Sequence, residues 1–355
     1  MTALHDHICD VIRGDGPMTV ARYMEICLTH PEQGYYTTRD PLGAAGDFTT
    51  APEVSQMFGE LIGLFLADYW LGIGRPSPVH LIELGPGRGT LMADALRAMK
   101  IVPDLTGAVQ VHFIEVSPAL EEMQKKAVPG ASWPGSLDEI PPGFCFVIAN
   151  EFFDCLPVRQ FIKTSPGWAE RMVALEDGKL VFTQGEVAGP LALPEAGFNP
   201  GDIKEACPQG AFWISAIAQR LKDFGGLALI IDYGYGREGA GDTFQAVKNH
   251  KPAAVLESPG QCDLTAHVNF VELKEKAEQN GLTAYGPVAQ GIFLQNIGIE
   301  ARAGKLLDQA NKKHKKDILS AVKRLVSKDE MGELFKVLCL AKKGEPAPAG
   351  FDQDQ

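Results

Sequence analysis

The stretch Val79-His-Leu-Ile-Glu-Leu-Gly-Pro-Gly-Arg-Gly-Thr-Leu91 decides the fold, because an apolar strand that ends in an acid runs directly into three alternate glycines. Gly85, Gly87 and Gly89 have no Cβ, so the backbone can turn sharply and approach a ligand closely. Residues 90–99 are predicted to form a helix whose N-terminal amides face that ligand. This strand, turn and helix are typical of a site for a nucleotide-like cofactor.

The spacing of the glycines separates two classes of cofactor. A dinucleotide fingerprint, G-x-G-x-x-G, needs glycine or alanine at its sixth position, where this chain has Thr90. Glu83, two residues before the first glycine, gives E-x-G-x-G-x-G, which resembles motif I of the class I S-adenosylmethionine-dependent methyltransferases. The sequence favours S-adenosylmethionine as the cofactor, with an NAD site and a purely structural turn as the alternatives.

Composition and charge indicate a cytoplasmic enzyme. The 355 residues are 45% hydrophobic, enough for one large domain or two. No apolar run is long enough to span a membrane, and the N-terminus lacks the pattern of a signal or transit peptide. The seven cysteines form no C-x-x-C pair, so we expect reduced packing thiols and no metal site. A net charge of −12 argues against nucleic acid and suits a basic partner, although acidity also serves solubility.

The hydrophobic pattern predicts an α/β protein with a Rossmann-like class I methyltransferase fold. We expect a mostly parallel seven-stranded sheet with helices on both faces, because four apolar runs are bounded by turn residues. These runs are residues 79–84, 109–116, 144–149 and 227–232. A further strand is expected near Trp133 and a final one at 334–341. A capping box with an early proline at 50–53 is expected to begin one long amphipathic helix.

We expect three parts along the chain. Residues 1–75 form an N-terminal helical cap region, and residues 76–343 form the methyltransferase domain. Two insertions interrupt that domain: residues 160–224, with a hairpin around 176–179, and the helical residues 298–333. The tail, 344–355, is expected to be disordered because of its proline-rich composition. The basic run 312–316 is read as a solvated helix face, or else as a docking site for an acidic partner.

A second cofactor signal is Glu115, at the end of the apolar run 111–116 and thirty positions after Gly85. A carboxylate there can accept hydrogen bonds from both ribose hydroxyls; the alternative is a solvated acid after a strand. Val116, which follows Glu115 directly, is a further candidate for the cofactor site. Ser136 and Leu137, close to Trp133, are candidates for the adenine pocket.

A third signal lies at the end of the fourth strand, in Ala149-Asn-Glu-Phe-Phe-Asp-Cys-Leu-Pro157. Ligands of open parallel sheets bind at the carboxyl ends of the strands, so Asn150, Glu151 and Asp154 are expected to face the reacting centre. Asp232, near the end of the fifth strand, is expected to face the same cleft. The alternatives are that Asp154 caps a helix and that Asp232 holds a turn.

Several motifs taken together resemble the MidA family, from about Met18 to Ala341. The most specific are Gly46-Asp-Phe48 and Asn150-Glu-Phe-Phe-Asp154; the others are Gly34-Tyr-Tyr36, Phe58-Gly-Glu60, Glu83 to Leu91, Asp232-Tyr-Gly-Tyr235, Gly241-Asp-Thr243 and Asp263 to Val268. That family includes a mitochondrial complex I assembly factor that symmetrically dimethylates an arginine of a complex I core subunit. The resemblance implies an S-adenosylmethionine-dependent arginine methyltransferase with a protein substrate, and leaves open whether this chain shares that target.

The chemistry of arginine methylation and the local sequence suggest roles for particular residues. A guanidinium stays charged and is a poor nucleophile until carboxylates orient it, so Glu151 is the first catalytic candidate, with Asp154 or Asp232 as its partner. The double-glutamate hairpin of the usual arginine methyltransferases is absent. His267 resembles the histidine of their Thr-His-Trp loop, but Val268 replaces the tryptophan and a lone histidine is more often structural. Gly46 belongs to a segment expected to fold over the cofactor, or to pack the N-terminal helices.

Three rival functions stay open: an NAD oxidoreductase, a small-molecule methyltransferase, and a non-catalytic assembly chaperone. We expect a protein partner, no nucleic acid and no membrane insertion. The sequence leaves open whether the chain acts as a monomer or a homodimer.

Overall fold

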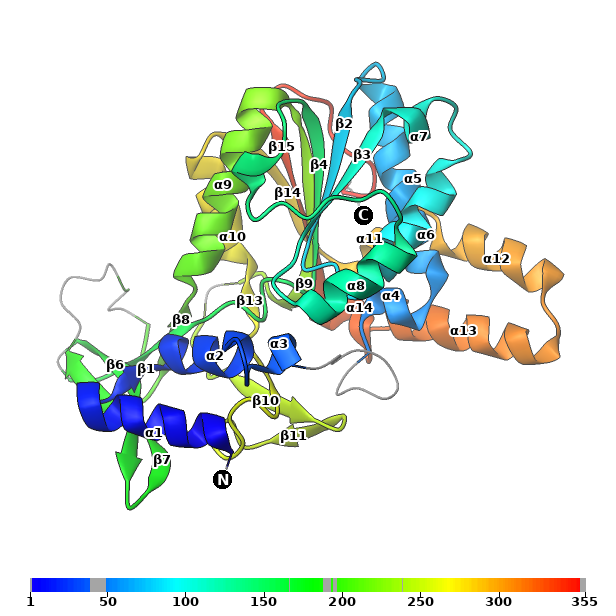
Figure 1. Ribbon diagram of the computed structural model, residues 1–355. Helices are drawn as coiled ribbons and strands as arrows, with labels where there is room; N and C mark the ends of the chain where they lie inside the picture. The colour runs from blue at the N-terminus through cyan, green and yellow to red at the C-terminus, as the bar shows by residue number, and fades with distance from the viewer. Residues whose placement is uncertain are drawn as a thin grey trace. The chain divides into compact units, whose positions relative to one another are not determined.

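The computed structural model describes residues 2–38, 49–165, 167–187, 193, 197–237 and 239–351, in two compact units. The first unit takes Met1–Phe48, Asp154–Phe212 and Arg237–His267, and the second takes Thr49–Phe153, Trp213–Gly236 and Val268–Gln355. The predicted division at residue 75 is therefore wrong. The chain passes between the units several times, so neither unit is continuous in sequence (Figure 1).

The second unit is built on a seven-stranded sheet. Its strands are β2 (Val79–Leu84), β3 (Val109–Ile114), β4 (Phe144–Asn150), β9 (Gly226–Tyr235), β13 (Val268–Asn269), β14 (Leu282–Ala289) and β15 (Phe335–Lys342). The order is β14-β15-β9-β4-β2-β3, and β13 pairs with β9. Neighbouring strands within β3-β2-β4-β9 pair in parallel, as do β9 and β13. Strand β15 pairs antiparallel with both β9 and β14. The predicted Rossmann-like, mostly parallel sheet is confirmed.

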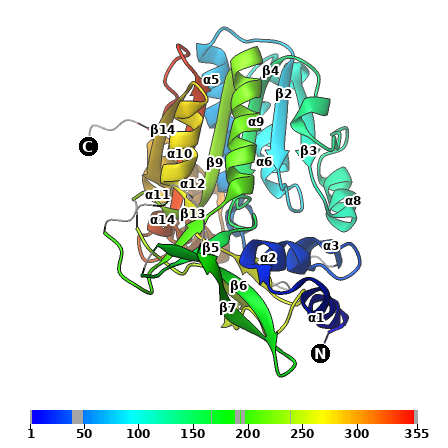
Figure 2. The ribbon, with the colours of Figure 1, turned by 90° about the vertical axis from the view of Figure 1, so that its left-hand side faces the viewer.

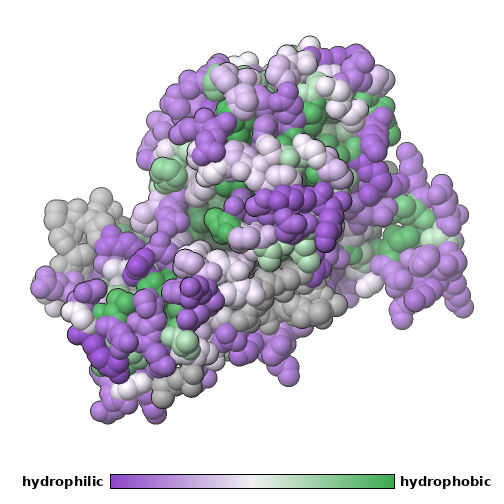
Figure 3. Space-filling model, viewed as in Figure 1, coloured by the Kyte–Doolittle hydropathy of each residue, from purple (hydrophilic) through white to green (hydrophobic). Residues whose placement is uncertain are grey.

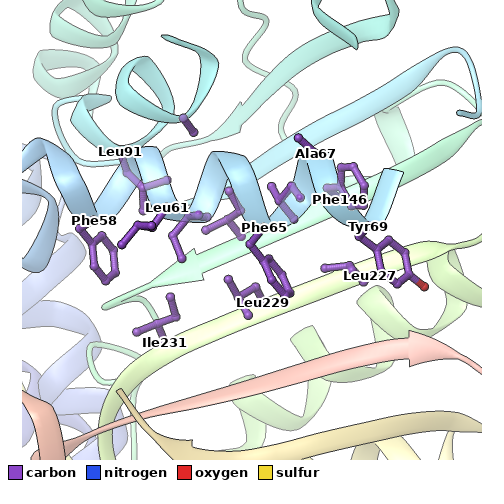
Figure 4. Packing of buried hydrophobic residues seen from close by; sticks show 14 of the residues in the cluster. Phe58, Leu61, Phe65, Ala67, Tyr69, Leu91, Phe146, Leu227, Leu229 and Ile231 are labelled. Carbon is purple, nitrogen blue, oxygen red and sulfur yellow. The ribbon is translucent and has the colours of Figure 1, made fainter. Parts of the chain in front are cut away.

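Helices cover both faces of this sheet (Figures 1 and 2). One face carries α5 (Gln56–Gly72) with α6 (Thr90–Met99), and the other carries α9 (Pro208–Phe224) with α10 (Phe270–Gln279). Figure 4 shows Phe58, Leu61 and Phe65 of α5 packed on Phe146 of β4 and Leu229 of β9. All six residues of β2 are buried, as expected for a strand covered on both faces.

Helices α5 and α6 pack unusually closely because glycines lie at their contact. A Cβ at Gly63 would lie 2.4 Å from the Ala95 carbonyl oxygen, and one at Gly59 would lie 2.7 Å from the Asp94 Cβ. The long helix expected after residue 50 is broken at Ser55 into α4 (Ala51–Val54) and α5. Ser55 caps α5 by accepting a hydrogen bond from the Met57 amide at 3.2 Å, which ends α4 after one turn.

The second unit contains further helices. They are α7 (Leu105–Ala108), α8 (Pro118–Ala127), the short 3-10 helix Leu137–Glu139, α11 (Gln290–Asn296), α12 (Ile299–Gln309), α13 (Lys312–Val326) and α14 (Met331–Leu334). The helical insertion predicted at 298–333 matches α12, α13 and α14. The strand expected near Trp133 is a single parallel bridge between Ser132 and His112. Within the described residues no helix is both long and apolar enough to cross a bilayer.

The tail prediction is wrong for the residues that the structure describes, which extend to Phe351. Phe351 is buried and packs in the core with Phe65 and Phe293. The Glu345 carboxylate accepts a hydrogen bond from the Tyr69 hydroxyl at 2.9 Å. The Gly226 amide also donates to Glu345, and Nδ2 of Asn296 donates to the Gly350 carbonyl. An apolar anchor and these hydrogen bonds fix a segment whose composition alone suggests disorder.

The first unit combines helices with two small sheets. The helices are α1 (Ala3–Asp15), α2 (Val20–Thr29) and α3 (Tyr35–Thr38). One sheet holds β1 (Met18–Thr19), β5 (Arg159–Lys163), β6 (Trp168–Glu176), β7 (Lys179–Val187) and β8 (Ile203–Ala206), and the other holds β10 (Gln245–Lys248), β11 (Lys251–Ala253) and β12 (Asp263–Thr265). The hairpin predicted around 176–179 is confirmed by β6 and β7. The predicted insertion 160–224 extends too far, because most of α9 belongs to the second unit.

Candidate active site

The glycine turn has the geometry that its sequence predicts. Gly85, Gly87 and Gly89 have φ angles of 61°, 54° and 79°, in the left-handed region that residues with a Cβ adopt at a cost. A Cβ at Gly85 would also lie 2.9 Å from Cδ2 of Phe152. Gly89 precedes the first turn of α6. The backbone between β2 and α6 is thus shaped for close approach to a ligand, with the amides of a helix N-terminus at its end.

Two buried acceptors at the ends of neighbouring strands fit a cofactor that carries a positive charge. Glu83, on β2, is 2% exposed, and its Oε2 has no hydrogen-bond partner among the described residues. Burial raises the pKa of Glu83 well above its ordinary value, and the nearby Glu115 carboxylate adds to this shift. Asn150, on β4, likewise has an Oδ1 without a partner in the described part of the chain. A buried acceptor is costly unless a ligand satisfies it, and the ammonium group of S-adenosylmethionine has the matching chemistry.

Glu115 lies directly after β3 and is held by three hydrogen bonds. Its Oε1 accepts from the amides of Val116 and Ser117, both at 2.8 Å, and its Oε2 accepts from Nε2 of Gln124 at 2.9 Å. Burial raises the pKa of Glu115, although these bonds oppose the shift. Val116 is 68% exposed, so it offers an apolar surface beside a fixed carboxylate.

Gln124, on α8, is a residue that the sequence interpretation missed. Its side chain is fully buried, and its Nε2 also donates to the Gly87 carbonyl at 2.7 Å. Its Oε1 accepts from Nε1 of Trp133 at 2.8 Å. Gln124 thus joins the glycine turn, Glu115 and Trp133, but a glutamine within an ordinary amphipathic helix carries no signal of this role.

The two residues predicted for the adenine pocket lie around the short 3-10 helix that follows Trp133. Ser136 immediately precedes that helix, and Leu137 begins it. The Leu137 side chain is 4% exposed, and its carbonyl accepts a hydrogen bond from Nη1 of Arg220 at 3.1 Å. Leu137 is therefore anchored to α9, on the same unit as the glycine turn.

Glu151 lies at the carboxyl end of β4 in a strained backbone conformation. Its φ angle is 51°, which a residue with a Cβ adopts at a cost of about 1–2 kcal/mol. Its Oε1 accepts hydrogen bonds from the Ala51 amide at 3.0 Å and from Nδ2 of Asn150 at 3.3 Å. Backbone strain at the carboxyl end of a strand, beside buried polar groups, is typical of a functional position.

Asp232 is fully buried on β9 and binds backbone amides. Its Oδ2 accepts from the Phe153 amide and its Oδ1 from the Tyr233 amide, both at 2.9 Å. This geometry favours the alternative in which Asp232 holds a turn. It fixes the chain that follows Glu151.

Asp154 and His267 belong to the first unit. No helix follows Asp154 before β5, so a role as a helix cap is wrong; its carbonyl accepts from the Ala266 amide at 2.9 Å. The His267 amide donates to Oγ1 of Thr243 at 2.9 Å, and burial lowers the pKa of His267. Gly46, the remaining predicted cofactor residue, lies outside the described residues.

Helix α4 connects the glycine turn to Glu151. The predicted capping box at its start does not form, because Thr50 makes no side-chain cap bond. Oε1 of Glu53 instead accepts from Oγ1 of Thr90 at 2.6 Å, and its Oε2 lies 3.6 Å from Nη1 of Arg88. The second unit thus brings Glu83, the three glycines, Glu115, Asn150, Glu151 and Asp232 to the carboxyl edge of its sheet.

Comparisons with known proteins agree with this geometry. A family of S-adenosyl-L-methionine-dependent methyltransferases matches residues 61–288. A Burkholderia thailandensis protein of the COG1565 superfamily, crystallised with S-adenosyl-homocysteine, is 27% identical with a TM-score of 0.83, and the match covers 99% of this chain and 95% of that one. The protein named "Protein arginine methyltransferase NDUFAF7, mitochondrial" from Xenopus tropicalis is 35% identical, covering 99% of this chain and 90% of the relative. Its human namesake is 37% identical, with 96% and 83% covered.

Proposed function

Since the chain belongs to the family of S-adenosyl-L-methionine-dependent methyltransferases, we propose that it methylates an arginine side chain of a partner protein. S-adenosylmethionine is its cofactor, and the resemblance to the MidA family is confirmed. The observation that carries the proposal is the nearly full-length similarity to relatives named protein arginine methyltransferases, together with a carboxylate at the end of β4.

The residues of the second unit suit a specific division of labour around the cofactor. When bound, S-adenosylmethionine supplies an electrophilic methyl group on a sulfonium sulfur. The backbone of the glycine turn admits the cofactor closely, and Glu115 accepts hydrogen bonds from the ribose hydroxyls. Glu83 and Asn150 supply the buried acceptors for its ammonium group. Gln124 fixes Glu115 and the turn in one arrangement before the cofactor binds.

Glu151 is proposed to orient the methyl acceptor. A carboxylate can pair with the planar guanidinium and direct one nitrogen at the methyl carbon, so that the carbon–nitrogen bond forms while the carbon–sulfur bond breaks. The sulfur keeps the electrons of the broken bond, and the nitrogen releases its surplus proton to solvent. Asp232 is proposed as a positioning residue, because it holds the Phe153 amide and with it the segment after Glu151. The catalytic roles of Asp154 and His267 stay predictions from the sequence.

The test is methyl transfer from radiolabelled S-adenosylmethionine to proteins of a strain that lacks this protein, followed by identification of methylarginine. We expect Glu151→Gln to lower turnover by at least about two orders of magnitude, because it keeps the shape and removes the charge. Calorimetry should find its affinity for S-adenosylhomocysteine nearly unchanged.

The exposed Glu275→Gln on α10 is the matched control, with normal turnover expected. Label in RNA, or only in small metabolites, would contradict the proposal. Cofactor binding without any transfer would favour the assembly chaperone. A normal rate in Glu151→Gln would leave the activity standing and remove Glu151 from the acceptor site.

The finer proposal concerns the target and its compartment. The MidA resemblance and the acidic chain support a core subunit of respiratory complex I as the substrate, dimethylated in the cytoplasm to support assembly; the curated relatives named above are mitochondrial by name. Mass spectrometry of that subunit with and without the protein would test the target. Cell fractionation would test the compartment.

A further inference from the structure

Helix α13 concentrates positive charge in an acidic chain. The helix has 15 residues, with Lys312, Lys313, Lys315, Lys316, Lys323 and Arg324 against one aspartate. The whole chain has a net charge of −12. Within the described part of the chain, none of these six basic side chains forms an ion pair. The charge therefore faces solvent without compensation from the protein's own carboxylates.

This charge pattern works against the stability of its own helix. Four of the lysines lie in the first turn and a half, where the helix dipole disfavours cations, and lysines three and four residues apart repel one another. Asn311 caps the helix by accepting from the amides of Lys313 and His314 at 3.1 and 3.0 Å, but it carries no negative charge. A charge arrangement that destabilises its own helix is typical of a segment with a function.

The base of the hairpin formed by α12 and α13 is firmly attached to the second unit. Arg302 of α12 donates to both carboxylate oxygens of the buried Glu60, at 2.8 and 3.1 Å. Gln290 of α11 donates from Nε2 to the Leu325 carbonyl of α13 at 2.9 Å. These bonds fix the α12–α13 hairpin, and with it the basic end of α13, to the second unit.

The hairpin also exposes apolar surface, visible in green among hydrophilic residues in Figure 3. Leu319 of α13 is 57% exposed, while Ile318 and Val322 are half-buried where α12 and α13 pack together. A partner that matches this face carries acidic side chains with one or two apolar residues.

Helix α13 shares a neighbour with the candidate active site. It packs against α4, whose Ala51 amide binds Glu151 and whose Glu53 binds Thr90 beside the glycine turn. A segment docked on α13 is therefore attached next to the helix that supports the site.

We propose that the α12–α13 hairpin docks an acidic, partly apolar segment of the protein that is methylated. This inference rests on the proposed function for the identity of the partner. A lipid surface is a poorer match, because α13 has no aromatic residue and Leu319 alone is largely exposed, too little for interfacial insertion. A phosphate backbone would be repelled by the acidic remainder of the chain.

The first test uses a fluorescein-labelled peptide of about 20 residues rich in glutamate and leucine, with fluorescence anisotropy as the readout. Replacing Lys312, Lys313, Lys315 and Lys316 by glutamine should weaken binding about tenfold, since each exposed pair contributes only a few tenths of a kcal/mol. High salt should weaken wild-type binding to a similar degree. Leu319→Gln should lower the affinity a few-fold without changing this salt dependence.

The control neutralises four exposed lysines elsewhere: Lys100, Lys179, Lys222 and Lys251. It changes the net charge equally and should bind the peptide as the wild type does. Equal binding by both quadruple variants, or no binding by the wild type, overturns the proposal. Stronger binding to vesicles with anionic lipid or to single-stranded RNA than to the peptide overturns the protein partner.

The second test separates this inference from the proposed function. Transfer of label to proteins of the deletion strain should be slower with the α13 variant at low acceptor concentration, and should recover as the acceptor concentration rises. Its affinity for S-adenosylhomocysteine should be unchanged. If no protein is methylated even by the wild type, the proposed function fails, while the peptide measurement still decides whether the hairpin docks an acidic segment. A variant with an unchanged KM for the protein acceptor overturns the substrate role.

Discussion

The buried pair His80 and His112 predicts how stability depends on pH. The two rings lie on neighbouring strands, with Nδ1 of His80 2.9 Å from Nε2 of His112. His80 Nε2 donates to the Pro142 carbonyl at 3.4 Å, which leaves its Nδ1 as the acceptor for His112. Nδ1 of His112 then accepts from Oγ of Ser132 at 2.7 Å. A proton added to Nδ1 of His80 would set its N–H against that of His112. A proton added to Nδ1 of His112 would only reverse the bond with the Ser132 hydroxyl, so what opposes a charge on His112 is its burial.

Burial lowers the pKa of His112 from 6.5 to about 4, with the charges of His80 and Arg220 as further causes. The unfolded chain takes up this proton near pH 6.5, whereas the folded protein resists it down to about pH 4. The stabilisation is therefore complete above pH 6.5 and is lost as the pH falls from 6.5 to 4. At about 1.4 kcal/mol per pH unit, the loss reaches about 3 kcal/mol.

Urea denaturation of wild type and His112→Asn, compared across this range, measures that loss free of the protein's other titrating groups. We expect the variant to be the less stable protein near neutral pH, and the difference to shrink or reverse toward pH 4. The exposed His314→Asn on α13 is the control and should follow the wild type at every pH. A stability difference between wild type and His112→Asn that stays constant with pH would refute the reasoning.

Three further stability predictions follow from packing and charge. Gly63→Ala should cost about 2–3 kcal/mol in urea denaturation, because its methyl group would lie 2.4 Å from a carbonyl oxygen of α6; Gly72→Ala, with no atom within 4 Å, should be neutral. Glu60→Gln should cost about 2 kcal/mol, since it removes the charge that pairs with Arg302; an unchanged denaturation midpoint would contradict this. Phe351→Ala should cost about 3 kcal/mol and loosen the tail toward proteolysis, and a disordered tail would show neither effect.

The sheet of the second unit could be predicted from sequence because its signals are local. Strand β2 coincides with its predicted bounds, since a mostly apolar run ends at a glycine. The conformation of the glycine turn follows from the residue type alone. The segment at Trp133, by contrast, pairs with the sheet through a single bridge at the neighbouring Ser132, and no run of apolar residues predicts it.

The errors arise where a distant partner decides the outcome. Glu53 has the spacing of a capping box, but the hydroxyl of Thr90, 37 residues away, binds it instead. From its position after a strand, the sequence predicts that Asp232 faces the cleft. In the structure its carboxylate oxygens accept hydrogen bonds from the Phe153 and Tyr233 amides. Gln124 becomes a site residue only through three partners from other elements. These contacts come from the tertiary structure, so spacing along the chain does not reveal them.

The discontinuous first unit has a consequence for synthesis on the ribosome. The hydroxyl of Thr2 donates to the Pro259 carbonyl, 257 residues later, and the hydroxyl of Tyr23 donates to the Val255 carbonyl, 232 residues later. Translation proceeds at roughly 5–20 residues per second, so these partners are synthesised about ten to fifty seconds after α1 and α2. Nascent chains therefore expose the apolar faces of two helices while much of the second unit is being translated. We expect chaperones that act during translation to bind this N-terminal segment.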